Sequence, residues 1–377
     1  MARIKTAKRP PDLSVEKEIG TILVIRLKAL GDIALSLPIV RSLRKGFPRA
    51  RIFYLCKRQY AEVLAGETSV DRVIVLPDGL GRQISMIRSL RRMKIDMTLD
   101  LLCSPRTANI TFLTGSRIRI GMDVGRHAWC YTNLLPRVMT ENGRRIKRYT
   151  FDSNLELVRL LNLCEQDVEL ERPATSAGTD RYAIGFPAAA AEREWADRYV
   201  SGLGLNGRRL VGVVPVANYQ SKSWPREYFI LLMNRMFEES GLVPVVLWGK
   251  GEEEAARAVA DEVPGAVLAP PTSIARLGAL IAHLDMLVTP DSGPKHLAVL
   301  QGVPTLTLFG PTDPEIWDPM NDIHRVLRGG ASCSPCRKKE CVPNSCLSEI
   351  EPDTVLNEIL DLLGSIGGST SEPGDLR

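Results

Sequence analysis

The sequence is poor in the residues that build several common kinds of site. Only four histidines occur among its 377 residues, so a metal site made of several histidines is not expected. No Asp-x-Asp tripeptide occurs either, and a metal–diphosphate clamp of that kind has no obvious ligands. With 44% hydrophobic and 25% charged residues the composition is that of a globular protein, and the length suffices for two domains.

The sequence also lacks segments that direct a chain into or across a membrane. The start of the chain, residues 1–20, is basic but has no apolar core of the signal-peptide kind, and no run approaches roughly 18 apolar residues. The sequence therefore predicts a cytoplasmic protein. In that compartment the widely spaced Cys56, Cys103, Cys130 and Cys164 are expected to be reduced thiols.

Basic residues are unevenly distributed in a chain whose formal net charge is +5. The stretch from Arg41 to Arg58 contains seven Lys or Arg residues and no acidic residue, and Arg82 to Lys94 adds five more. Such clusters either form a solvated face or meet nucleic acid, anionic lipid or an acidic glycan.

Apolar strands and amphipathic helices alternate along the chain, which predicts α/β domains with parallel, doubly wound sheets. The first set of expected strands covers residues 21–27, 51–56, 72–77, 96–102 and 117–122, and the second covers 209–216, 242–249, 265–270, 284–289 and 304–310. Between the sets, residues 165–180 are polar and aperiodic, as expected of a linker or domain edge. The predicted organisation is a disordered or extended segment at 1–20, domains at 21–172 and 173–350, a helix at 351–365 and a disordered tail at 366–377.

A polar segment, TPDSGPKHLAVLQGVP at residues 289–304, separates two of the expected strands. Pro294 suits the first turn of a helix, where no backbone N–H is missed. The turn would aim backbone N–H groups out of the carboxyl edge of the sheet, where open α/β sheets bind ligands and helix ends attract phosphate. In this helix His296 is either a packed core residue or part of that anion site.

Two further loops are expected at the same sheet edge. Ser221 and Lys222 precede a helix, and Lys222 is either an ordinary surface lysine or a cation that neutralises a diphosphate. Glu252 and Glu253 begin another helix, where the macrodipole favours acidic residues. One of these acids is a candidate to accept hydrogen bonds from ribose hydroxyls.

Glycine-rich turns give little support to a dinucleotide-binding enzyme. The turn after the first strand, KALGD at residues 28–32, has a single glycine, which argues against a Rossmann dehydrogenase. The segment GLGLNG, Gly202–Gly207, follows a helix and precedes a strand, the reverse of a pyrophosphate-binding turn. Asp32 either caps the next helix or has a chemical role, and Pro38 predicts a kink or late start in that helix.

Four cysteines near the C-terminus follow the spacing C-x2-C-x4-C-x4-C: Cys333, Cys336, Cys341 and Cys346. Thiolates this close could hold zinc or an iron–sulfur cluster, although the second spacing is not that of a common zinc ribbon. Free thiols and labile disulfides are the alternatives.

Together these segments resemble glycosyltransferase family 9, the bacterial ADP-heptose:lipopolysaccharide heptosyltransferases. The resemblance covers nearly the whole chain and is carried by residues 24–55, 221–229 and 289–317, followed by the cysteines and a final helix. It implies the GT-B fold: two facing Rossmann-like doubly wound domains with a C-terminal helix. The first domain would bind the acceptor and the second, which includes the cysteine cluster, the nucleotide sugar.

The activity that the resemblance implies is inverting, metal-independent transfer of heptose from ADP-heptose to the lipopolysaccharide inner core. A lipid-anchored acceptor implies peripheral contact with the inner membrane, and nucleic acid is not an expected partner. Position by position, Asp32 matches the family's proposed base and Lys222 its phosphate-binding lysine, with Ser221 beside it. The nucleotide-sugar motif maps to Asp291, Ser292, Gly293 and His296, and the ribose-binding acid to Glu252 or Glu253.

Two alternatives remain open at this point. One is an enzyme of the same fold that uses another nucleotide sugar, because phosphate motifs do not read the sugar. The other is a non-catalytic nucleotide-sugar or metal-binding protein in which the cysteine cluster is the functional element.

Overall fold

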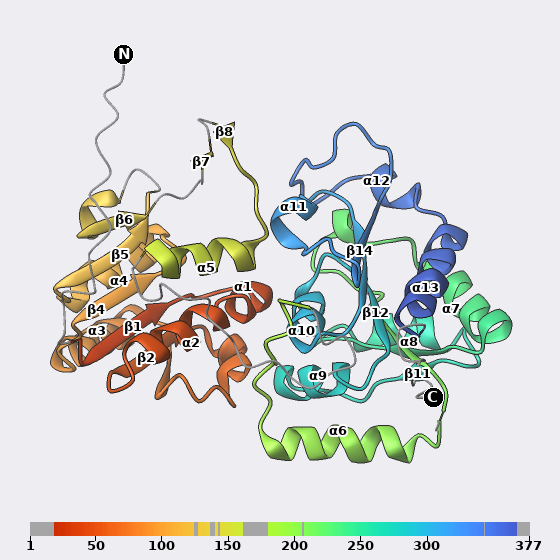
Figure 1. The fold of residues 1–377 in the computed structure, drawn as a ribbon, viewed down its shortest axis with the longest axis horizontal. Helices are drawn as coiled ribbons and strands as arrows, with labels where there is room; N and C mark the ends of the chain where they lie inside the picture. Colours follow the sequence, from red (N-terminus) through yellow and green to blue (C-terminus); the bar gives the residue numbers. More distant parts are fainter. Residues whose placement is uncertain are drawn as a thin grey trace, which may run out of the picture. The chain divides into compact units, whose positions relative to one another are not determined.

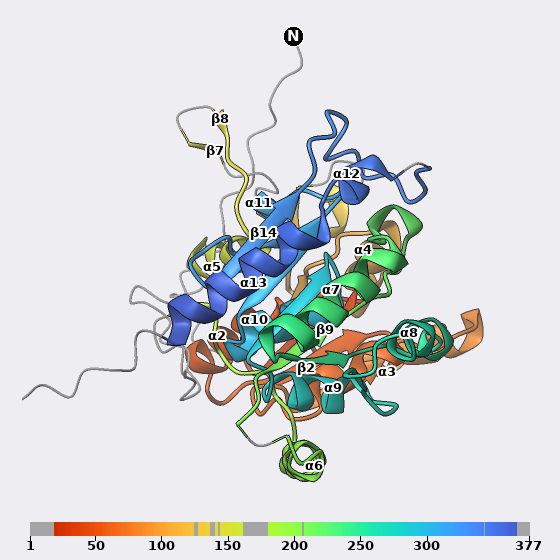
Figure 2. The same ribbon diagram turned by 90° about the vertical axis from the view of Figure 1, so that its right-hand side faces the viewer.

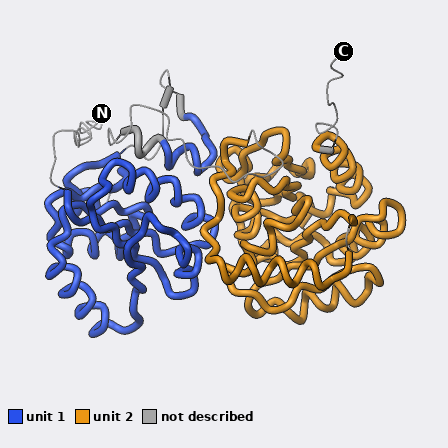
Figure 3. Tube along the Cα trace, turned by 60° about the horizontal axis from the view of Figure 1, so that its bottom comes forward, with its two compact units in different colours: residues 1–170 blue, residues 171–377 orange. Residues whose placement is uncertain are grey.

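The structure, a computed structural model, describes residues 19–123, 127–135, 140–141, 144–160, 180–205, 207–342 and 344–367. The chain divides into two compact units, residues 1–170 and 171–377 (Figure 3). Most of the predicted N-terminal segment, tail and linker falls on positions 1–18, 368–377 and 161–179, which lie outside the described residues. The predicted start of the tail at residue 366 was wrong, because the last helix continues to Gly367.

The first unit is built on a six-stranded parallel sheet with the order β3-β2-β1-β4-β5-β6 (Figure 1). Its strands are β1 (Thr21–Ile25), β2 (Arg51–Cys56), β3 (Arg72–Val75), β4 (Met97–Asp100), β5 (Ile118–Met122) and β6 (Asn133–Leu135). Five of them were predicted. The sixth, β6, was missed because three residues are too short to show a period.

Helices connect these strands in the predicted alternation. They are α1 (Leu30–Ala34), α2 (Leu37–Gly46), α3 (Leu80–Arg92), α4 (Pro105–Thr114) and α5 (Thr150–Leu160), with 3₁₀ turns η1 (Arg58–Leu64) and η2 (Ala128–Cys130) and a hairpin of β7 (Thr140–Glu141) and β8 (Arg144–Arg145). Pro38 has the predicted effect: the helix after β1 stops, and α2 restarts with this proline in its first turn.

The strand order reverses between β1 and β4. Open α/β sheets bind their ligands at such a reversal, which is called the switch point. Because crossovers between parallel strands are right-handed, the helices before and after the reversal cover opposite faces. Accordingly α2 contacts α5, and α3 contacts α4. The carboxyl ends of β1 and β4 thus border the switch point of the first unit, and Asp32 follows β1 there.

The second unit repeats this topology with the order β11-β10-β9-β12-β13-β14, again all parallel. Its strands are β9 (Leu210–Val213), β10 (Val243–Val246), β11 (Val267–Leu268), β12 (Met286–Pro290), β13 (Thr305–Phe309) and β14 (His324–Arg328). The last strand was not predicted. It is an edge strand with charged residues, which the apolar pattern of buried strands does not reveal.

Helices cover both faces of the second sheet. They are α6 (Ala190–Gly202), α7 (Arg226–Ser240), α8 (Glu253–Ala260), α9 (Ile274–Ile281), α10 (Gly293–Gln301), α11 (Pro314–Trp317), α12 (Ser345–Ser348) and α13 (Pro352–Gly367), with a 3₁₀ turn η3 (Gln220–Lys222). Figures 1 and 2 show α7 and α13 together on one face and α9 and α10 on the other, as their contacts require. Gly202 ends α6 ahead of β9, so the GLGLNG segment is not a phosphate-binding turn.

The predicted C-terminal helix is present as α13 and belongs to the core of the second unit. Its buried Leu356, Ile359 and Leu363 join a cluster that includes Phe229 of α7 and Val211 of β9. Burying side chains of this size contributes roughly 1.5–3 kcal/mol each. No helix in the described part of the chain is long and apolar enough to span a bilayer.

Two helical glycines of the second unit differ in the space around them, which gives a test of the packing. A Cβ at Gly278 in α9 would lie 2.3 Å from two ring atoms of Phe186, whereas nothing lies within 4 Å of one at Gly364 in α13. Overpacking a core typically costs about 1–3 kcal/mol, whereas replacing glycine by alanine within a helix stabilises it by only about 1 kcal/mol. At Gly278 the cost should therefore outweigh the gain. We expect Gly278→Ala to lower the unfolding free energy in urea and Gly364→Ala to raise it by about 0.5–1 kcal/mol. Equal effects would contradict the packing at Phe186.

Candidate functional site

The switch point of the second unit brings together two predicted site residues. Strand β9 leads to the loop that carries Lys222, and the adjacent β12 leads directly to Asp291. The Lys222 Nζ donates to the Asp291 Oδ2 atom at 2.6 Å and to the Asp291 carbonyl at 3.0 Å. Both residues were predicted at this edge, but not their ion pair.

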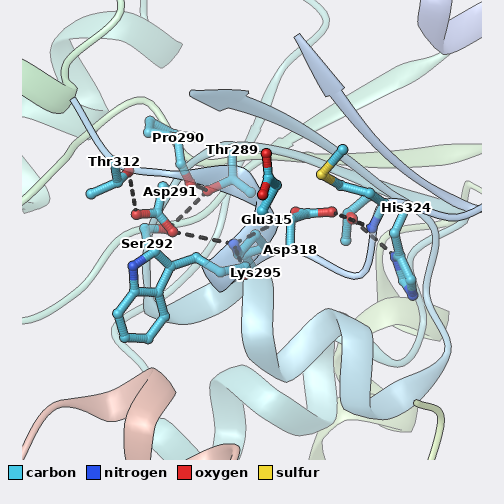
Figure 4. A network of polar contacts seen from close by, with 12 residues as sticks. Thr289, Pro290, Asp291, Ser292, Lys295, Thr312, Glu315, Asp318 and His324 are labelled. Carbon is cyan, nitrogen blue, oxygen red and sulfur yellow. Dashed lines mark hydrogen bonds and ion pairs between the residues drawn. The ribbon is translucent and has the colours of Figure 1, made fainter. Parts of the chain in front are cut away.

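Asp291 is the centre of a buried polar network (Figure 4). Its carboxylate is nearly buried, and its Oδ2 atom also accepts a hydrogen bond from the Thr312 hydroxyl at 2.8 Å. Its Oδ1 atom lies 3.2 Å from the Nζ of Lys295, one turn along α10. Three segments that are distant in sequence are therefore joined at one carboxylate.

Lys295 is a member of this network that sequence reasoning did not assign. Its side chain is fully buried, donates to the Trp317 carbonyl and lies 3.5 Å from Asp318 Oδ2. Its Nζ is also 4.7 Å from the centre of the Phe309 ring, a cation–π contact. A lysine between proline and histidine in an otherwise apolar helix was the available signal, because a buried lysine requires partners.

The charges of the network fix the ionisation states of its members. Burial acts to raise the pKa of Asp291, but the charges of Lys295 and Lys222 outweigh it and hold that pKa well below its usual range. Burial, and next the charge of Lys295, lowers the pKa of His296 well below its usual range. At neutral pH Asp291 is thus an anion and His296 is uncharged.

The N-terminus of α10 adjoins these charges. Ser292 is the N-cap residue, but its hydroxyl is 2.9 Å from the Thr289 hydroxyl, and no side chain of the described residues caps the helix. The first-turn N–H groups of a helix have no partner within the helix, and Gly293 has no side chain to obstruct an approaching group. This end of α10 can therefore bind an anion beside Lys222.

His296 is the fourth residue of α10, and its ring packs against that of Trp317 in a T-shaped arrangement with 6.3 Å between the ring centres. The residue is 4% exposed, and its Nδ1 atom has no hydrogen-bond partner among the described residues. It is therefore a buried histidine, but not one whose Nδ1 is satisfied by the protein.

Ser221, predicted beside Lys222, turns away from the network. The residue is buried, its hydroxyl donates to the Lys338 carbonyl at 2.7 Å, and its N–H donates to the Lys339 carbonyl at 3.2 Å. Both acceptors belong to the segment that contains the four cysteines.

The two candidate ribose-binding acids differ in their contacts. Glu252 lies at the start of α8, and its Oε2 accepts from the Gly249 N–H at 2.8 Å at the carboxyl end of β10. Glu253 is exposed and pairs with Arg257 one turn further along the helix. Glu252 is therefore the acid that the loop holds at the sheet edge.

In the first unit Asp32 has the capping contact that was one of its two interpretations. Its Oδ2 accepts from the Ala29 N–H at 3.0 Å in the first turn of α1, and its Oδ1 forms an ion pair with Arg26. A second carboxylate at this edge, Asp100, is 1% exposed and accepts from the Tyr131 hydroxyl, and burial raises its pKa. Asp32 is more accessible, with 17% of its side chain exposed.

The cysteine cluster ranges from the exposed Cys333 to the buried Cys346. Burial raises the pKa of the Cys346 thiol. The described residues nevertheless contain no group of three His, Cys, Asp or Glu side chains arranged to hold a metal ion. The structure gives no support to the predicted metal site at these cysteines.

Two doubly wound parallel sheets, one in each unit, are the architecture of the GT-B class of proteins. A profile described as "Glycosyltransferase family 9 (heptosyltransferase)" matches residues 83–346, and the chain belongs to this family. It is therefore a glycosyltransferase, which excludes the non-catalytic alternative.

Individual relatives agree with this assignment. Lipopolysaccharide heptosyltransferase 3 of Escherichia coli is 23% identical over 360 residues, covering 90% of this chain and 98% of the relative. A family 9 glycosyl transferase from Veillonella parvula matches the fold with a TM-score of 0.75 at 23% identity, covering 93% of this chain and 99% of that one. The Escherichia coli heptosyltransferase WaaC with ADP matches with a TM-score of 0.64 at 19% identity, with coverages of 93% and 99%.

The ion pairs of Asp291 predict a pH-dependent stability. Removing one partner of a buried ion pair costs about 3–5 kcal/mol, so Asp291→Asn should lower the unfolding free energy at pH 7 by about that amount. A carboxylate whose pKa falls on folding contributes stability above its ordinary pKa of about 4 and loses it as the pH drops below that value. The deficit of the variant, measured by denaturant unfolding, should therefore shrink in acid.

The matched control is Glu253→Gln, which removes an exposed ion pair in the same unit. Its deficit should stay below about 1 kcal/mol at each pH. A deficit for Asp291→Asn that is equally small, or that does not change with pH, would contradict the network.

Proposed function

We propose that this protein is an inverting glycosyltransferase that moves heptose from ADP-heptose to the lipopolysaccharide inner core. The observation that carries the proposal is the pairing of Lys222 with Asp291 at the α10 N-terminus, on the switch point of the second sheet. Supporting it, relatives that span the chain are named lipopolysaccharide heptosyltransferases, and a solved structure of similar fold holds ADP.

On the donor side, the diphosphate would bind at the first turn of α10, near Ser292 and Gly293. When the glycosidic bond to phosphate breaks, the electron pair stays on the departing ADP, which gains negative charge. Lys222 stabilises that charge, and only an interaction that strengthens in the transition state speeds the reaction. Asp291 holds the lysine in place, and the neutral His296 supplies a hydrogen-bonding group for the phosphate or the sugar.

Recognition of the nucleoside would involve Glu252 rather than Glu253. The Glu252 carboxylate is held at the carboxyl end of β10 by the Gly249 N–H, and such acids accept hydrogen bonds from ribose hydroxyls. Glu253 is engaged with Arg257 on the surface.

On the acceptor side, Asp32 would act as the general base. Inversion requires an acceptor hydroxyl oxygen to bond to the anomeric carbon opposite the departing ADP while its proton passes to a base. Asp32 supplies a partly exposed carboxylate, whereas Asp100 is enclosed. The Arg26 guanidinium would keep the Asp32 carboxylate in a fixed orientation.

A direct test incubates the purified protein with core-truncated lipopolysaccharide and a panel of nucleotide sugars, and weighs the products. ADP-heptose should give a product heavier by one or more heptosyl units. Transfer from another nucleotide sugar in preference to ADP-heptose would favour the same-fold alternative.

The role of Asp32 can be separated from its capping contact. Asp32→Asn keeps an oxygen for the Ala29 N–H but removes the proton acceptor, so turnover should fall by roughly 10² to 10⁴. The weakened contact with Arg26, which is partly buried, should lower stability by about 1.5–3 kcal/mol. Product formation rates and denaturant unfolding measure the two effects.

The matched control is Asp96→Asn. Asp96 also accepts backbone N–H groups, those of Gly20 and Thr21, but at the opposite edge of the same sheet. Its replacement should leave turnover unchanged. Normal turnover of Asp32→Asn, or a loss that follows unfolding, would assign Asp32 to capping alone.

We further propose that the enzyme works at the cytoplasmic face of the inner membrane and contacts it through the outer surface of α3 and α4. These helices touch each other and contain five arginines and no acidic residue. Four of their apolar side chains are well exposed: Leu80 (76%), Ile84 (41%), Phe112 (44%) and Leu113 (39%). Arginines beside exposed apolar groups suit an anionic bilayer surface, where each cation contributes about 1 kcal/mol.

Flotation with lipid vesicles tests this surface without any enzymatic readout. The wild-type protein should bind vesicles containing phosphatidylglycerol better than purely zwitterionic vesicles, and Leu80→Ser with Ile84→Ser should weaken binding roughly tenfold. Leu231→Ser with Leu360→Ser is the control, because these residues are 42% and 41% exposed on the second unit. Equal binding by both double variants would reject the α3–α4 surface.

A further inference from the structure

The segment from Cys333 to Cys346, here called the cysteine segment, contacts two loops of the donor site. One is residues 219–223, which carries Lys222, and the other is residues 310–312, which carries Thr312. The side chains of Lys222 and Thr312 meet at a single atom, Asp291 Oδ2. Contacts that fix these two loops therefore also fix the positions of Lys222 and Thr312 at Asp291 Oδ2.

The cysteine segment holds the Lys222 loop through backbone groups. Its carbonyls at Lys338 and Lys339 accept from the hydroxyl and the N–H of Ser221. In the other direction, the Cys341 N–H donates to the Gln220 side-chain oxygen at 2.8 Å. The two residues before Lys222, Gln220 and Ser221, are thus hydrogen-bonded to this segment.

Asn344 fixes the same loop on both sides of Lys222. Its Nδ2 donates to the Ser223 carbonyl at 3.0 Å and to the Gln220 carbonyl at 3.4 Å. The amide is itself oriented, because the thiol of Cys346 donates to the Asn344 Oδ1 at 3.3 Å. Cys346 is buried, so this contact is partly buried.

The Thr312 loop is held by the opposite end of the cysteine segment. The Arg337 N–H donates to the Pro311 carbonyl at 2.8 Å, and the Ser334 hydroxyl donates to the Gly310 carbonyl at 2.6 Å. The two loops also touch each other, since a Cβ at Gly310 would lie 3.1 Å from the Ser221 carbonyl oxygen.

We propose that the cysteine segment is a positioning element of the donor-phosphate site, acting through Lys222 and Thr312. Ser221 and Asn344 are then positioning residues that do not touch the donor. This inference rests on the proposed function in one respect, namely that the donor diphosphate binds at Lys222.

The physical benefit lies in the flexibility of lysine. A lysine side chain loses considerable conformational entropy when it is held in one place. If its loop is already fixed, less conformational entropy is lost when the donor binds. Loss of one or two hydrogen bonds that fix the loop should therefore weaken ADP binding by roughly three- to tenfold.

A double-mutant cycle on ADP affinity, measured by calorimetry, tests the proposal. The four proteins are the wild type, Asn344→Ala, Lys222→Ala and the double variant. If Asn344 acts through Lys222, its replacement should raise the Kd for ADP roughly three- to tenfold in the wild type but less than about twofold without the lysine. A purely structural effect on folding would weaken ADP binding by the same factor in both backgrounds.

Two further variants keep the result decisive. Ser221→Ala removes one contact to the Lys338 carbonyl and should show the same dependence on Lys222, which decides the matter if Asn344→Ala does not fold. Cys333→Ser changes an exposed thiol of the same segment and should leave the Kd unchanged.

The outcomes separate the two proposals. No ADP binding by the wild type, or an unchanged Kd in Lys222→Ala, would overturn the donor site and this inference with it. A second outcome is that Lys222→Ala weakens ADP binding, but Asn344→Ala and Ser221→Ala change the Kd by the same factor with and without Lys222. That result would reject the positioning role and leave the donor site standing.

Discussion

The sheet edge of the second unit depends on one buried carboxylate. Asp291 is nearly enclosed, and a charge in that position is tolerated only when it is paired and hydrogen-bonded. Its partners come from three places: Lys222 after β9, Lys295 in α10 and Thr312 after β13. Satisfying Asp291 therefore fixes the loops at the carboxyl edge of the sheet, and the N-terminus of α10 lies among them.

The two lysines around Asp291 have different roles. Lys295 is fully buried between Asp291, Asp318 and Phe309, where it balances charge inside the protein. The Lys222 side chain is 18% exposed and can exchange part of its contact with Asp291 for a phosphate. The network thus leaves one cation partly exposed to solvent, and the cysteine segment is hydrogen-bonded to the loop that carries this cation.

The sequence was sufficient for the architecture because buried parallel strands are continuous apolar runs that alternate with helices. It also predicted that Lys222 and Asp291 lie at one edge of the second sheet, since the carboxyl ends of strands next to a switch point must converge. What it did not reveal depends on contacts between distant segments. The burial of Lys295 and the orientation of Ser221 depend on their partners Asp318 and Lys338, which are distant in the sequence. The edge strand β14 contains charged residues and therefore lacks the apolar run by which buried strands are recognised.

The central claim is that the pair formed by Lys222 and Asp291 marks the donor-phosphate site. A crystal structure of the protein with ADP tests this most directly. We predict phosphate oxygens within hydrogen-bond distance of the Lys222 Nζ and of backbone N–H groups in the first turn of α10, with Asp291 still holding Lys295. ADP bound elsewhere, or a Lys222 side chain that contacts only Asp291 in the complex, would contradict it.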